Sequence, residues 1–157
     1  MSTGAFFAAL GYRFWIQEGT TSSTAPTSST GMTELLSLTD ASVNQKSDIT
    51  DIIDYGSPKG FKAKLVTGQS YSIPMELHID LTSPGYALLH HAALNSGTGV
   101  TVMWYRESPL QGTATTPEKY SGVAFVSDLV EDVKAGGVAT VKFSLEGYGQ
   151  PVYSEQV

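Results

Sequence analysis

Apolar and polar residues alternate one for one in several segments of this 157-residue chain. In residues 137–149, for example, Val141, Phe143 and Leu145 are each separated by one polar residue. Successive side chains of a strand point to opposite faces of a sheet, so a period of two predicts half-buried β-strands. By this criterion we expect strands over residues 10–18, 34–38, 61–67, 71–80, 99–106, 120–133 and 137–149. The predicted fold class is therefore mainly β, with antiparallel strands.

Two of these segments are expected to form a hairpin. Residues 61–67 and 71–80 each carry their apolar side chains at odd-numbered positions. Cross-strand partners must share a face, so the connecting loop must have an odd length. A turn at residues 68–70 meets this condition and pairs Phe61 with Leu77.

Residues 82–97, TSPGYALLHHAALNSG, form the one segment that reads plainly as a helix. Pro84 suits the first helical position and Gly97 suits a left-handed stop. We therefore expect a flanking α-helix over about residues 84–95. An apolar stripe on one side of it, suited to packing on a sheet, is formed by Leu88, Leu89, Ala92 and Ala93. The expected architecture is an antiparallel β-sandwich or barrel with one flanking helix and long inter-strand loops.

His90 and His91 are neighbours at the centre of this helix. Adjacent helical residues point about 100° apart and cannot chelate one ion, which needs a spacing of three or four. We interpret both histidines as structural and expect no metal site. No phosphate-binding loop, nucleophile elbow or paired acid and base can be picked out either. The sequence therefore predicts no cofactor and no enzyme activity.

Two segments are predicted to be long loops. Nine of the eleven residues from Thr20 to Thr30 are Ser or Thr, so we expect a mobile loop over residues 19–31. Residues 39–60 lack clean periodicity and are expected to form an extended loop. This second segment retains the apolar side chains of Ile49, Ile52, Ile53 and Tyr55. Such a long irregular connection is unusual in a compact domain, which indicates a role beyond joining two strands.

The composition is typical of one acidic, lightly charged domain covering residues 1–157. Charged residues make up 15% of the chain, against roughly 25% in an average soluble domain. The formal net charge of −6 argues against a basic surface that binds nucleic acid. There is no cysteine, which excludes disulfides and thiolate metal sites. No stretch has the features of a secretion signal or a membrane span, so neither is expected.

The segment 122–130 is apolar on both faces of its predicted strand. Such a strand must be covered on both sides, and a domain of this size supplies one core. We expect a second copy of the chain to supply the other cover. Phe125 is assigned to the core because large aromatics dominate cores, and Ala124 and Val126 on the opposite face are assigned to the subunit interface.

Several segments resemble the major tail tube proteins of long-tailed bacteriophages. They are SDITDIIDYGSPKG, DLTSPGYALLHHAALNSGTGVTVMWYR and YSGVAFVSDLVEDVKAGGVATVKFSLEGYGQPVY. The resemblance covers residues 34–153 and implies a β-barrel or sandwich that assembles into sixfold rings. The rings stack into a tube whose sheets form a continuous inner wall, as in the similar tube proteins of type VI secretion.

The resemblance also implies the role and the partners of the chain. It implies a structural virion protein of the tail, assembled in the host cytoplasm, whose lumen passes DNA during ejection without binding it specifically. The implied protein partners are other copies of the chain, the tape measure protein, the tail terminator and the baseplate or tip. Contacts between stacked rings are assigned to the extended loop, with Asp48, Ile49, Ile52, Ile53 and Tyr55 as candidates.

An alternative from a different class is a carbohydrate-binding or receptor-binding β-sandwich module. In that interpretation Trp15, Trp104 and the tyrosines would form a stacking platform for the ligand. Electron microscopy separates the two hypotheses, because tubes or rings favour the first and a stable monomer favours the second.

Overall fold

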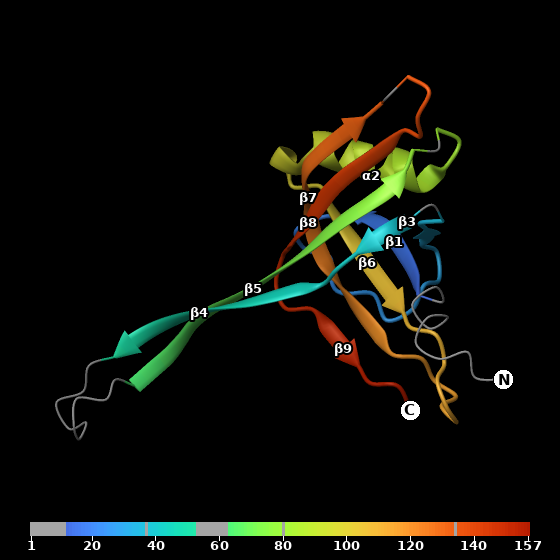
Figure 1. Ribbon diagram of the computed structural model, residues 1–157. Helices are drawn as coiled ribbons and strands as arrows, with labels where there is room; N and C mark the ends of the chain where they lie inside the picture. The colour runs from blue at the N-terminus through green and yellow to red at the C-terminus, as the bar shows by residue number, and fades with distance from the viewer. Residues whose placement is uncertain (1–11, 37, 53–62, 80, 134) are drawn as a thin grey trace.

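The computed structural model describes residues 12–36, 38–52, 63–79, 81–133 and 135–157. Figure 1 shows a curved sheet, an α-helix that lies against it and a two-stranded ribbon that projects away from both. In chain order the elements are β1 (Arg13–Gly19), β2 (Thr33–Glu34), β3 (Leu38–Ala41), β4 (Asn44–Ile52), β5 (Ala63–His78), α2 (Pro84–Leu94), the 3-10 helix η2 (Ser96–Thr98), β6 (Thr101–Glu107), β7 (Lys119–Asp132), β8 (Thr140–Gly147) and β9 (Val152–Ser154).

The strands form one antiparallel sheet. Its main path runs β2-β1-β6-β7-β8-β5-β3, while β4 pairs with β5 and β9 pairs with β7. Among the described strands, β2 and β3 at the two ends of this path do not pair with each other, so the sheet does not close into a barrel. The expected mainly β fold with one helix is confirmed, and the open sheet fits a sandwich rather than a barrel.

The core lies on the face of the sheet that α2 covers. Val141, Phe143 and Leu145 of β8 all point into it, as their alternation predicted. Trp104 of β6 is completely buried and stacks on Phe14 with 5.8 Å between ring centroids. Inward-facing side chains of five strands therefore meet in a single apolar cluster.

Tyr71 is buried in this core, where its ring packs against Trp104. Its hydroxyl donates to the carbonyl of Val123 at 2.7 Å and accepts from the Trp104 indole N–H at 3.2 Å. A Cβ atom on Gly147 would lie 2.2 Å from the Tyr71 ring, so only glycine fits beside it. The Tyr71 hydroxyl and the Trp104 indole N–H are thus both hydrogen-bonded inside the core.

The helix α2 agrees with its predicted range. Pro84 occupies the first turn, and Leu89 and Ala92 are buried against the sheet. The predicted stop at Gly97 is wrong, because η2 continues the chain and Gly99 takes the left-handed conformation with φ of 90°. Leu88 and Ala93 are partly buried against the same core, so all four residues of the predicted stripe face the sheet.

The predicted hairpin with a turn at residues 68–70 is wrong. Residues 63–78 form one continuous strand, and Gln69 and Ser70 pair with Ser47 and Lys46 of β4. The apolar side chains keep odd numbers on both sides of residues 68–70, as an uninterrupted strand requires. This shared parity is a sequence signal that favoured one strand.

The predicted extended loop over residues 39–60 is also largely wrong. Residues 39–41 belong to β3 and residues 44–52 form β4, while residues 53–60 lie outside the described residues. All nine positions of β4 are exposed, so no alternation of burial marks the strand in the sequence. The partner strand, rather than a buried face, holds β4 in place.

The Ser/Thr-rich segment connects β1 to β2 without any strand of its own. Its first turn is closed by a hydrogen bond from the Ser23 amide to the Thr20 carbonyl at 3.1 Å. The Thr101 hydroxyl donates to the same carbonyl at 2.9 Å and ties this turn to β6. The predicted loop is present, and its mobility stays a prediction.

Candidate subunit interface

A two-stranded ribbon projects from the body of the subunit, and we call it the arm. It consists of β4 and residues 63–71 of β5, and Figure 1 shows it extending away from the rest of the sheet. A two-stranded ribbon on its own is marginally stable in water. The arm therefore lacks the cover that the core gives to β1, β6, β7, β8 and the body half of β5.

The arm exposes apolar side chains on both of its faces. Ile49 pairs directly with Val66, so these two share one face. Leu65 pairs with Thr50, and Ile52 is two residues further along β4, so Leu65 and Ile52 share the other face. The four apolar side chains are between 41% and 58% exposed. Neither face is covered by the subunit itself.

The structure places the predicted interface residues in two groups. Asp48, Ile49 and Ile52 lie together on the arm, where all three are exposed. Ile53 and Tyr55 lie outside the described residues. Sequence reasoning missed Leu65 and Val66, although two adjacent apolar residues in a strand already indicate two apolar faces.

Ala124 and Val126 were assigned to the wrong face of β7. They are 0% and 3% exposed and belong to the subunit's own core. Phe125, which was assigned to the core, lies on the opposite face and packs edge-on against Tyr148 at 5.5 Å. Ala124 and Val126 lie in the same core cluster as Trp104. Both side chains therefore help to fill the subunit's own core, which leaves little of their surface for a neighbouring subunit.

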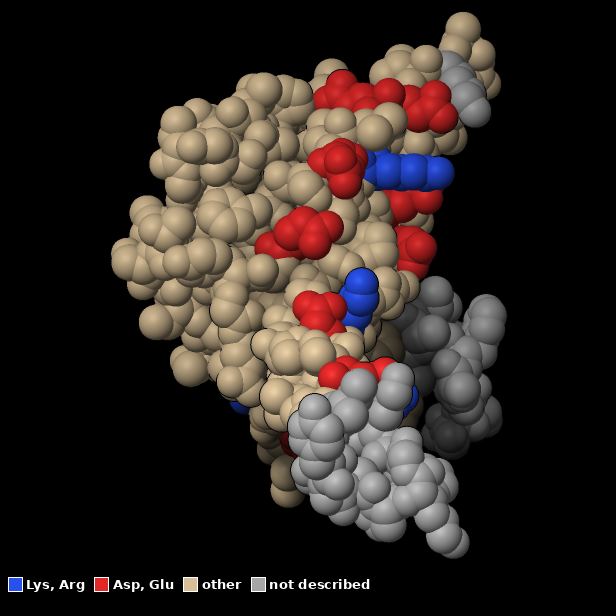
Figure 2. Space-filling model, turned by 90° about the vertical axis from the view of Figure 1, so that its left-hand side faces the viewer, with Lys and Arg blue, Asp and Glu red and all other residues tan. Residues whose placement is uncertain are grey.

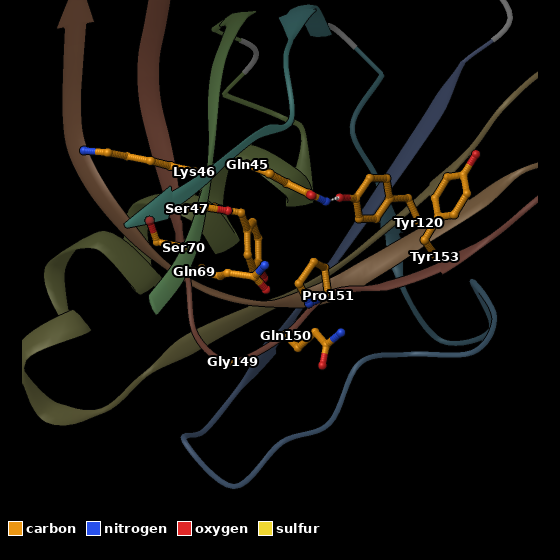
Figure 3. A pocket seen from close by; sticks show the side chains of 12 residues that line it. Gln45, Lys46, Ser47, Gln69, Ser70, Tyr120, Gly149, Gln150, Pro151 and Tyr153 are labelled. Carbon is orange, nitrogen blue, oxygen red and sulfur yellow. Dashed lines mark hydrogen bonds between the residues drawn. The ribbon is translucent and has the colours of Figure 1, made fainter. Parts of the chain in front are cut away.

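A polar cleft of about 640 Å³ lies between the base of the arm and the C-terminal segment (Figure 3). Gln45 of the arm reaches across it and donates a hydrogen bond to the Tyr120 hydroxyl. Tyr153 of β9 packs edge-on against Tyr120, with 5.3 Å between ring centroids. The cleft is lined by Gln45, Lys46, Ser47, Gln69, Ser70, Tyr71, Tyr120, Gly147, Gly149, Gln150, Pro151 and Tyr153. The Gln45 side chain thus links the arm to the body.

A charged cluster anchors the C-terminal strand behind this cleft. Glu118 accepts hydrogen bonds from Arg106 at 2.7 Å and from the Tyr153 hydroxyl at 2.6 Å. The hydrogen bond to the Glu118 carboxylate raises the pKa of Tyr153, so the hydroxyl keeps its proton at neutral pH. The guanidinium of Arg106 also lies over the Tyr120 ring, 5.3 Å from its centroid. These contacts hold β9 against β7.

The hairpin of β7 and β8 ends in a second exposed surface, which we call the tip. It comprises residues 128–133 and 135–139. Asp128 adopts a positive φ of 54° at a bulge that shifts the pairing of β7 with β8. Beyond the bulge, Val130, Val133 and Val138 are between 59% and 74% exposed. A groove of about 370 Å³ beside the bulge is lined by His90, Ala93, Leu94, Ser96, Val126, Ser127, Asp128 and Leu129.

The two histidines of α2 contact carboxylates on different strands. His91 Nδ1 lies 3.0 Å from Glu18 of β1, and His90 Nε2 lies 3.5 Å from Glu131 at the tip. Glu131 also accepts a hydrogen bond from the Tyr86 hydroxyl, which raises the pKa of Tyr86 to about 12. Both imidazoles therefore connect the helix to the sheet. No group of three or more potential metal ligands occurs among the residues that the structure describes.

Charge is distributed unevenly between the arm segment and the rest of the chain. Residues 44–67 contain four of the nine basic residues and three of the fifteen acidic ones, a balance of +1. The remaining five basic and twelve acidic residues give −7, which together with +1 makes the total of −6. Figure 2 shows acidic side chains gathered along the side from which the arm projects. The body is thus acidic and the arm segment is not.

No helix in the described part of the chain is long and apolar enough to cross a membrane. No protein-family model matches the sequence, and no curated protein matches it.

Solved structures do match this fold. The tail tube protein of SPP1 superimposes with a TM-score of 0.67 at 11% identity, over 94% of this chain and 78% of that one. A chain of the native gene transfer agent virion gives 0.65 at 8% identity, over 98% and 99% of the two chains. A chain of the anti-feeding prophage baseplate, a sixfold-symmetrised structure, gives 0.62 at 14% identity over 99% and 98%. The chain therefore has the fold of tail tube proteins.

Proposed function

We propose that this chain is a structural virion protein that assembles into sixfold rings, and that the rings stack into a tail tube for DNA ejection. The observation that carries the proposal is the arm, which exposes apolar side chains on both faces although the subunit already has a complete core. Such surface on a soluble protein is typical of an interaction site. The fold is similar to that of chains from tail and baseplate structures, one of them sixfold-symmetrised, and this supports other copies of the same chain as the partner.

Free strand edges support the joining of sheets between neighbouring copies. Among the described strands, β4 pairs only with β5, so the other edge of β4 has no strand partner there. Pairing of β7 with β6 ends at Ala124, and residues 125–132 of β7 have β8 as their one paired neighbour. Unpaired edges readily accept a strand from another chain. In our proposal, neighbouring copies meet at such edges and extend the sheet into a continuous wall.

The arm is proposed to make the contacts between stacked rings. Asp48, Ile49 and Ile52 contribute from β4, and Leu65 and Val66 contribute from β5. Ile53 and Tyr55 stay candidates from the adjoining segment. Burial of these side chains on assembly would supply the driving force, because each buried methylene contributes roughly 0.8 kcal/mol.

The proposed tube passes DNA without specific binding. An acidic body repels phosphate, which is the opposite of the basic surface that nucleic-acid binding requires. We further propose a location in the virion tail, assembly in the host cytoplasm, and contacts with the tape measure protein, the tail terminator and the baseplate or tip.

The carbohydrate-binding or receptor-binding alternative receives less support. Trp104 is completely buried and Trp15 is only 6% exposed, so neither ring is free to stack on a ligand. Tyr153 beside the polar cleft is the exposed aromatic that this alternative would have to use.

Negative-stain electron microscopy of the purified protein tests the proposed function. We expect sixfold rings or tubes, with a sedimentation coefficient far above that of a monomer of 16.7 kDa. A protein that stays monomeric as its concentration rises would contradict self-assembly.

A further inference from the structure

The pairing of the two arm strands shifts by one residue partway along the arm. Asp48 of β4 pairs with Gly68 of β5, whereas the next residue of β4, Ile49, pairs with Val66. Thr67 is therefore an extra residue in the ladder, which is the defining feature of a β-bulge. We propose that this bulge aims the part of the arm beyond it, so that Thr67 is a positioning residue for assembly. The inference rests on the proposed function of the arm.

Hydroxyl groups hold the bulge in place. The Thr67 hydroxyl donates to the Asp48 carbonyl at 3.2 Å, and it accepts from the Thr50 hydroxyl at 3.4 Å. Both hydrogen bonds join β5 to β4 at the point where the pairing shifts. A bulged strand bends and its local twist increases. Figure 1 shows the two strands crossing each other partway along the arm. The bulge thus gives the outer arm a defined direction.

The bulge also decides which apolar side chains share a face of the arm. Alternation along β4 puts Gln45 and Ile49 on one face. Their partners on β5 are Tyr71 and Val66, so Val66 lies on the face that continues from the core residue Tyr71. Leu65 has the same parity as Tyr71 in the sequence, and the extra residue turns it to the opposite face. The apolar surfaces of the outer arm are therefore set relative to the body at this point.

A change at the bulge is carried to the end of β4. Ile52 lies three residues beyond Ile49, or roughly 10 Å at about 3.3 Å per residue. The core of a protein interface is packed as densely as a protein interior, so a small displacement of this side chain removes its contacts. The direction of the arm therefore matters for assembly as well as its apolar surface.

Deletion of Thr67 tests the proposal, because it makes the ladder regular without exchanging the two faces of the arm. Asp48 and Ile49 would then pair with Gly68 and Val66 as direct neighbours on both strands. The matched control is Thr67→Ser, which keeps the extra residue and its hydroxyl. Both variants should fold as judged by circular dichroism, since the change lies in the arm and outside the core.

The distance between two spin labels reports the direction of the arm in the dissociated subunit. The chain has no cysteine, so two introduced cysteines carry the labels uniquely. Asp51→Cys with Lys142→Cys joins the outer arm to the body, and Lys46→Cys with Lys142→Cys joins the base of the arm to the body. All three positions are exposed. We expect deletion of Thr67 to change the first distance and to leave the second unchanged, while Thr67→Ser changes neither.

In negative-stain electron microscopy, the deletion variant should lose tube formation, whereas wild type and Thr67→Ser form tubes. An unchanged distance from position 51 to position 142, or normal tubes from the deletion variant, would show that the bulge does not aim the arm for assembly. If wild type itself forms no tubes, the proposed function fails, and the label distances still decide whether the bulge sets the direction of the arm.

Discussion

The two halves of β5 place similar side chains in different surroundings. Ile73 and Leu77 in the body are 0% and 4% exposed, whereas Leu65 and Val66 in the arm are 52% and 53% exposed. The body half lies between β8 and β3, while the arm half has β4 as its neighbour. The core thus accounts for the apolar residues of the body, and those of the arm call for another molecule.

The largest expected effect is a charge placed in the core. Val126→Asp should prevent folding, because it buries an unpaired carboxylate at a site that is 3% exposed, at a cost of several kcal/mol. Phe125→Asp, its sequence neighbour on the opposite face, should cost far less and leave a folded subunit. Circular dichroism and urea unfolding of the two variants measure the difference. Equal loss of folding in both would contradict the two faces assigned to β7.

A charge introduced into the arm should prevent assembly without preventing folding. Leu65→Asp is expected to abolish sedimenting tubes while changing the free energy of unfolding by no more than about 0.5 kcal/mol, as for other exposed sites. Thermal unfolding of the dissociated subunit and a pelleting assay give the two readouts. Thr67→Ser on the same strand is the control, since it keeps a hydroxyl for the Asp48 carbonyl. Normal pelleting of Leu65→Asp would show that this face is not needed for assembly.

Loss of the hydrogen bond between the arm and the body should lower the stability of the subunit moderately. Gln45→Ala and Tyr120→Phe each remove the hydrogen bond that joins the arm to the body. We expect a loss of about 1 kcal/mol from either change. Because both variants lose the same contact, the double variant should cost little more than the larger single one, which a double-mutant cycle measures. Fully additive effects would indicate that the two side chains act independently.

The smallest effect is expected at the edge of the body, where Arg13 of β1 pairs with Glu34 of β2 at 2.8 Å. The hydrogen bond from Arg13 holds the pKa of Glu34 below its usual value. The pair therefore stabilises the fold above the ordinary glutamate pKa, and this contribution is lost as the pH falls through the lowered value. Glu34→Gln should be slightly less stable than wild type at pH 7 and equally stable in strong acid. A difference that persists in acid would assign the effect to another cause.

Alternation predicted the body well and the arm poorly. In β8, Val141, Phe143 and Leu145 face the core, and the polar residues between them face away from it. This contrast produces an alternating pattern in the sequence. The strand β4 has no buried face in the subunit, so its residues lack alternation and resembled a loop. Ala124 and Val126 show a related difficulty, because periodicity separates two faces of a strand and does not say which one turns inward.

Electron microscopy of wild type beside Leu65→Asp, at equal concentration and in the same buffer, tests the central claim most directly. The account predicts sixfold tubes for wild type and, for the variant, folded subunits or single rings that do not stack into tubes. Dispersed monomers of wild type, or long tubes in both samples, would contradict the claim that this chain assembles through its arm.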